Sequence, residues 1–163
     1  MPKLVLPVML MLILPAFAGA NHLDNVAHQT VTFQVSPISE LSVSGNPGLL
    51  HVIQAVAGSE PADVDDASTT YSLTCNEEDR KITARLDDPM PSGMELMLEL
   101  AAPPGATSLG FVALSGTDQN IVTGIDGVCE TGKTITYRCC ADADAGVIVS
   151  DSRTVTLTLT GVE

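Results

Sequence analysis

The sequence predicts an all-β protein, a single antiparallel β-sandwich of about eight or nine strands. Two observations support this fold class. Apolar and polar residues alternate in short runs, and clusters of Gly, Pro, Asp and Asn separate the runs. Patterns typical of helices are almost absent. Because threonine and serine occupy the polar positions of most runs, we expect antiparallel sheets with one buried and one hydrated face.

The first strand is expected between Thr30 and Gly45. Its odd-numbered positions include five apolar residues, as in a strand that buries one face: Val31, Phe33, Val35, Leu41 and Val43. Pro37 interrupts the alternation without changing its phase. This strand has two possible partners, either the last strand of its own domain, at residues 154–160, or an open groove in another copy of the chain.

Residues 70–75 and 81–87 form the next pair of alternating runs, and the sequence EEDR between them is typical of a turn. The two runs are therefore expected to form a hairpin. Further strands are expected at residues 49–55, 94–100, 109–115, 120–125, 133–140 and 153–162. Residues 58–69 and 87–93 are loops by composition.

The segment from Met1 to Ala20 resembles a cleaved signal peptide. Lys3 precedes an uncharged apolar run, and small residues before Ala20 suit a signal peptidase, with Ala18 as the alternative cleavage site. A membrane anchor is the competing interpretation, but the run is shorter than the ~20 apolar residues of a bilayer span. We expect export to the cell surface or medium. The expected parts are a signal peptide (1–20), an extension (21–29) and one sandwich domain (30–163), with no membrane span in the mature chain.

The chain is strongly acidic, with 20 Asp and Glu residues against 7 Lys and Arg and a net charge of −13. Binding to nucleic acid rests on the neutralisation of phosphates by basic side chains. Docking to an anionic membrane surface needs basic residues as well. The composition therefore argues against both kinds of partner.

The four cysteines are Cys75, Cys129, Cys139 and Cys140. In an exported chain they are expected to form disulfides. Cys75 and Cys139 share the apolar face of their strands, so a core bridge Cys75–Cys139 is the first choice. Cys140 must face the other way, which leaves a Cys129–Cys140 bridge as the second choice, or intermolecular use of both. The sequence contains no C-x-x-C pair, so we do not expect a zinc site.

Motifs of catalysis are missing from the sequence. It contains no G-x-S-x-G and no H-E-x-x-H motif, so we expect neither an enzyme nor a cofactor. The acidic residues Asp63, Asp65 and Asp66 lie together in an expected loop, and carboxylate oxygens on a loop are ligands that Ca²⁺ prefers. They are the candidate calcium ligands, although their spacing does not match the twelve-residue calcium loop.

The amino-terminal residues extend the alternation of the first strand toward the chain start. The apolar residues at its odd-numbered positions are Leu23, Ala27, Val31, Phe33 and Val35. Such a terminal strand can be donated to the next subunit, which generates a head-to-tail fibre. The expected partner is therefore another copy of the same chain.

The runs VTFQVSPISELSVSG, STTYSLTCNEEDRKITARLD, LELAAPPGATSLG and SRTVTLTLT resemble small secreted β-sandwich proteins of prokaryotic cell surfaces. That group includes the subunits of chaperone–usher-type and related strand-exchanged pili. The resemblance implies an immunoglobulin-like sandwich without cofactors or catalytic residues, polymerised through a donated terminal strand. It favours a structural subunit of an extracellular filament, pilus or surface coat. The alternative is a monomeric secreted adhesin or binding module for a surface ligand, with or without stabilisation by calcium.

Overall fold

A computed structural model describes residues 26–161 and divides the chain into two units. The first unit ends at Gln34 and the second begins at Val35. The expected signal peptide, its cleavage site and Leu23 lie outside the described residues. Residues 26–34 of the first unit form no helix or strand.

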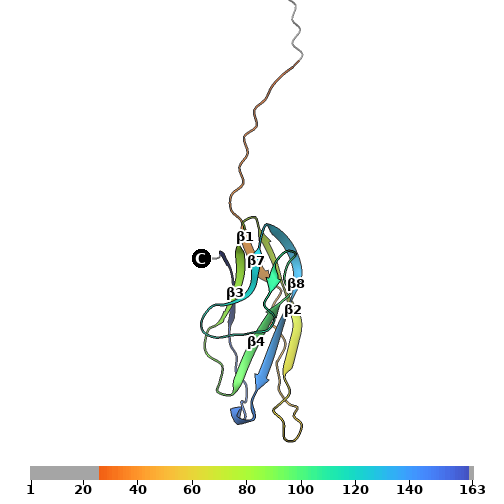
Figure 1. The fold of residues 1–163 in the computed structure, drawn as a ribbon, viewed down its shortest axis with the longest axis vertical. Coiled ribbons are helices and arrows are strands. Elements are labelled where there is room, and N and C mark those ends of the chain that lie inside the picture. The colour runs from red at the N-terminus through yellow and green to blue at the C-terminus, as the bar shows by residue number, and fades with distance from the viewer. Residues whose placement is uncertain (1–25, 162–163) are drawn as a thin grey trace, which may run out of the picture. The chain divides into compact units, whose positions relative to one another are not determined.

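The described part of the second unit contains nine strands and one short 3-10 turn (Figure 1). The strands are β1 (Ser39–Val43), β2 (Val64–Cys75), β3 (Arg80–Leu86), β4 (Met94–Leu100), β5 (Thr107–Ser108), β6 (Val112–Ala113), β7 (Gln119–Ile125), β8 (Val128–Ala141) and β9 (Val155–Gly161). The turn η1 covers Ala143–Ala145. No helix in residues 26–161 has the length and apolar character needed to cross a membrane.

The strands form two antiparallel sheets, which confirms the all-β prediction. One sheet has the order β1-β2-β8-β4-β6, and the other has the order β5-β7-β3-β9. Long strands β2 and β8 form the centre of the first sheet, and β3 is paired on both sides in the second. The arrangement is β-sandwich-like because the inner faces of both sheets contribute to one hydrophobic core.

Alternation within the strands builds this core. In β4 the even-numbered Leu96, Leu98 and Leu100 are buried, whereas the neighbouring Glu95 is exposed. The largest fully buried side chains come from five strands: Tyr71, Ile82, Leu98, Leu100, Ile121, Val122, Ile125 and Ile135. Burial of each large apolar side chain contributes about 1.5–3 kcal/mol, which makes this cluster the main source of stability.

The expected hairpin of residues 70–75 and 81–87 is wrong. The strands exist as β2 and β3, but they belong to different sheets: β2 pairs with β1 and β8, whereas β3 pairs with β7 and β9. The short connection between them therefore crosses from one layer to the other. Alternation predicts that a segment is a strand but does not specify its neighbour.

Three other expected boundaries differ from the structure. The first strand covers only Ser39–Val43 rather than residues 30–45, and it pairs with β2, not with the last strand. Residues 49–55 form no strand apart from an isolated bridge between Ala55 and Pro61. The expected loop at 58–69 instead contains the start of β2. In each case pairing, rather than the local pattern, decides where a strand begins.

Candidate functional site

A long groove runs along the open edge of the second unit. It is lined by β9, by the chain just before β9 and by the segment from Gly45 to Ala55, called here the 45–55 segment, and has a volume of about 1480 Å³. The inner faces of β4 and β8 contribute Leu96, Ile135 and Tyr137 to its lining. These residues also belong to the core, so the groove gives access to the hydrophobic interior between the sheets.

Strand β9 forms one wall of the groove and is the edge of its sheet. It pairs with β3 on one side, from Arg80 opposite Gly161 to Leu86 opposite Val155, and with no strand of the described residues on the other. Its inward-facing Leu157 and Leu159 are only half-buried. The β3 residues opposite them, Ala84 and Ile82, are buried completely. An unpaired edge beside an incompletely covered apolar face is the requirement for strand addition.

The start of β9 is held by polar contacts at one end of the groove. The Thr154 backbone N–H donates to Asp87 Oδ1 at 2.8 Å, and the Asp87 N–H donates to the Thr154 carbonyl at 3.0 Å. Arg153 Nε donates to the Pro89 carbonyl at 2.8 Å. Asp87 and Arg153 thereby fix the point at which the chain enters the edge strand.

These contacts predict a loss of stability in acid. The Thr154 backbone hydrogen bond lowers the pKa of Asp87 below its ordinary value. A lowered folded-state pKa stabilises the fold above the unfolded pKa of about 3.9, and the contribution disappears as pH falls through the folded value. We expect the melting temperature to fall below about pH 4 and to fall less steeply for Asp87→Asn. Thermal melts from pH 7 to pH 2 measure this, and parallel curves for the two proteins would contradict it.

The exposed large apolar side chains are concentrated at the groove and in one other segment. Twelve such residues are exposed in the described chain, and five of them line the groove: Val43, Leu49, Ile53, Val147 and Val149. Val147 and Val149 are each 96% exposed. Contiguous exposed apolar surface on a small domain marks a contact site more often than scattered single residues do.

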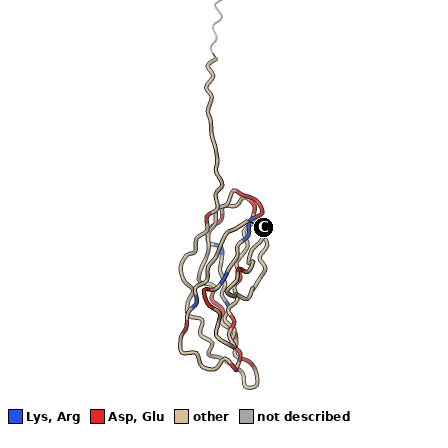
Figure 2. Tube along the Cα trace, turned by 90° about the vertical axis from the view of Figure 1, so that its left-hand side faces the viewer, with Lys and Arg blue, Asp and Glu red and all other residues tan. Residues whose placement is uncertain are grey.

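The second concentration is the segment of residues 26–38, called here the arm. It contributes five more of the twelve exposed apolar residues: Val26, Val31, Phe33, Val35 and Ile38. Although the chain has a net charge of −13, residues 26–39 contain no Asp, Glu, Lys or Arg (Figure 2). The expected polymerisation residues Ala27, Val31, Phe33 and Val35 are all exposed and outside any strand.

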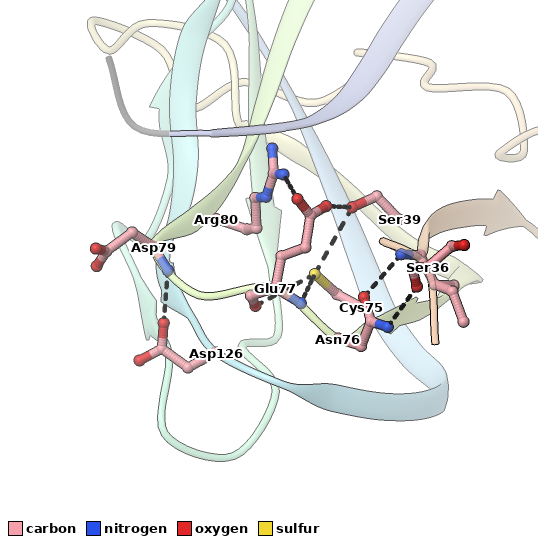
Figure 3. Close-up of polar contacts among 9 residues, drawn as sticks. Ser36, Ser39, Cys75, Asn76, Glu77, Asp79, Arg80 and Asp126 are labelled. Carbon is pink, nitrogen blue, oxygen red and sulfur yellow. Dashed lines mark hydrogen bonds and ion pairs between the residues drawn. The ribbon is translucent and has the colours of Figure 1, made fainter. Parts of the chain in front are cut away.

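The root of the arm is fastened to the connection between β2 and β3 (Figure 3). The Asn76 side chain accepts from the Ile38 N–H at 2.7 Å and donates to the Ser36 carbonyl at 2.9 Å. Ser39 Oγ donates to Glu77 at 2.7 Å, and Glu77 also forms an ion pair with Arg80. No sequence pattern distinguishes Asn76, because a lone Asn in a turn resembles any other turn residue.

The predicted disulfides do not fit this fold. Cys75 lies opposite Val128, whereas Cys139 lies eleven residues farther along β8, opposite Val64. At about 3.3 Å per residue this separates the two cysteines by roughly 35 Å, although a disulfide needs Cα atoms within about 7 Å. Cys129 and Cys140 are equally far apart on β8. All four thiols are free.

The thiols are expected to differ in reactivity. Cys75 and Cys139 are buried and Cys129 is exposed, while burial and the neighbouring Asp63 raise the pKa of Cys140 to about 11. The thiolate is the reactive form. We therefore expect iodoacetamide at pH 7 to modify Cys129 first, and all four cysteines only after unfolding. Mass spectrometry of the monomer counts the modified sites, and a folded chain with two bridged cysteines would contradict the prediction.

The three candidate calcium ligands have different partners. Asp65 and Asp66 lie in β2, and Asp63 lies just before it. Asp65 accepts two hydrogen bonds of 2.7 Å from Arg138, whose guanidinium lies 4.0 Å from the Phe111 ring centroid. Asp66 accepts from Ser68 and from the Gly48 N–H. Asp63 lies beside the Cys140 thiol. Among the described residues, no group of three or more His, Cys, Asp or Glu is arranged to hold a metal ion.

Comparison with known proteins gives no match to a family model, a curated protein or a solved structure.

Proposed function

We propose that this protein is the structural subunit of an extracellular filament or surface coat, in which the arm of one copy occupies the groove of the next. The proposed framework is an immunoglobulin-like sandwich that presents an incomplete edge. The apolar start of the chain, interpreted as a signal peptide, supports export to the cell surface. The partner is a second copy of the chain.

One observation carries this proposal. Ten of the twelve exposed large apolar residues belong either to the arm or to the lining of the groove, five to each; only Val56 and Leu109 belong to neither. Exposed apolar surface is costly, so its division between two segments indicates that each covers the other. An arm and a groove on every chain form a heterologous pair, which propagates head to tail.

The dimensions of the two surfaces agree. The alternating part of the arm, residues 30–36, equals β9 in length, and β9 has seven residues. As an added strand, the arm pairs its backbone with the free edge of β9 and directs Val31, Phe33 and Val35 into the groove. Complete burial of these three side chains is worth about 1.5–3 kcal/mol each.

The charges favour the same pairing. The globular part of an acidic chain repels other copies of itself, and the repulsion acts over about 8 Å at physiological ionic strength. The arm has no charged residue between positions 26 and 39, so its insertion adds no charge to the groove. Buried charges without partners would oppose binding.

The first test is electron microscopy of the protein purified from residue 21 onward, with the molar mass measured by light scattering on the same sample. We expect filaments of uniform width that coexist with little monomer. A monodisperse monomer at all concentrations would contradict the proposal and direct the search to a ligand for the groove instead.

A further inference from the structure

The groove has a second wall, the 45–55 segment. Part of its backbone, like the free edge of β9, has no hydrogen-bond partners among the described residues. All residues of the 45–55 segment line the groove. Within the described chain, residues 49–53 make no hydrogen bond. Their sequence, Leu-Leu-His-Val-Ile, is nevertheless typical of a strand. Backbone groups left without partners are normally satisfied once a site is covered.

The 45–55 segment is anchored on both sides of these free residues. At one end, the Ser44 N–H donates to the Thr70 carbonyl at 2.9 Å and the Gly48 N–H donates to Asp66 Oδ2 at 3.3 Å. A Cβ on Gly48 would come within 2.9 Å of that carboxylate oxygen, so glycine permits the close approach. At the other end, the Ala62 N–H donates to the Gln54 carbonyl at 2.7 Å.

The side chains between the anchors are already divided between two sides. Leu50 packs against the core and Val52 is half-buried, whereas Leu49 and Ile53 are 84% and 69% exposed. This alternation is that of a strand with one apolar face turned inward. Both walls of the groove thus combine an inward apolar face with unpaired backbone groups.

We propose that the arm of a second copy lies between β9 and residues 49–53 and pairs with both, so that these residues become a strand only on assembly. This inference rests on the proposed function and deepens it. The arm becomes a central strand with two ladders rather than an added edge. Its backbone donors and acceptors are then satisfied on both sides, and the assembled sheet exposes no edge at β9.

Hydrogen exchange of the filament, compared with a monomeric Phe33→Asp variant, tests the pairing directly. We expect the amides of residues 49–53 to exchange freely in the monomer and about tenfold more slowly, or slower still, in the filament. Protection of the arm and β9 without protection of 49–53 would overturn this inference and leave the proposed function intact. Protection of 49–53 in the monomer would also overturn it, because the segment would then pair within its own chain. An unprotected arm would overturn both.

Proline substitutions supply a second, independent test. Consecutive N–H groups of a strand point to opposite sides, so one of Val52→Pro and Ile53→Pro must remove a donor that faces the arm. Neither N–H is bonded in the described structure, so both variants are expected to fold. Val56→Pro is the matched control, because Val56 lies just outside the groove lining and its N–H is also unbonded. We expect at least one of the two variants to assemble tenfold more weakly than the control; equal assembly of all three would overturn the inference.

Discussion

The Phe33→Asp variant is expected to remain monomeric at concentrations at which the unaltered protein forms filaments. Phe33 is 88% exposed and is the largest apolar side chain of the arm. Its replacement removes about 2–3 kcal/mol of apolar burial and places a carboxylate in an apolar groove, which together weaken binding more than 100-fold. Light scattering over a range of concentrations measures the effect. Leu109→Asp is the matched control, because Leu109 is exposed but belongs to neither surface.

The same reasoning applies to the groove. Val149→Asp is expected to prevent assembly as well, because Val149 is 96% exposed and lines the groove. A mixture of the two variants contains one intact arm and one intact groove, on different chains. It should therefore form dimers but no longer species, as judged by mass. Filaments formed by either variant alone would show that arm and groove do not meet.

Alternation in the sequence predicted the face of each strand better than its position. The run at residues 94–100 became β4 with the expected buried and exposed sides, and the last run became β9. Each of these predictions needs only the two-residue period of a strand. Neighbour relations need contacts far apart in sequence, so the expected hairpin of residues 70–87 was wrong.

The cysteines illustrate the same limit. Both Cys75 and Cys139 are buried, as their shared face predicted, but they lie at opposite ends of the β2–β8 pair. Whether a position in a strand is odd or even specifies the side of the sheet to which its side chain points. The position along the sheet follows from register, which bulges near Asp66 and Tyr71 also alter.

The sequence indicates only one of the two surfaces of the candidate site, the arm. The alternating apolar residues of the arm, with Phe33 at their centre, are evident in the sequence, whereas the groove is not. The groove depends on β9 lying at an edge and on residues 49–53 failing to pair, and both properties arise from tertiary structure. In this protein, a strand pattern without a partner strand marks the surface that we propose to receive the arm.

Core and groove leucines are expected to differ in their contribution to the monomer, which tests whether the groove is open in solution. In the monomeric Phe33→Asp background, Leu98→Ala should lower the free energy of unfolding by about 2–5 kcal/mol, because Leu98 is fully buried and its removal leaves a cavity. Leu157→Ala should cost only about 1–2 kcal/mol, because Leu157 is half-buried at the groove.

Urea denaturation of the two variants measures this difference. If the arm covers Leu157 in the filament, Leu157→Ala in the otherwise unaltered chain should in addition weaken assembly, since the truncated side chain no longer contacts the inserted strand. Leu98→Ala lies away from the groove and should weaken assembly only as far as it unfolds the subunit. Equal losses of stability for the two leucines in the monomer would mean that the groove is already filled by its own chain.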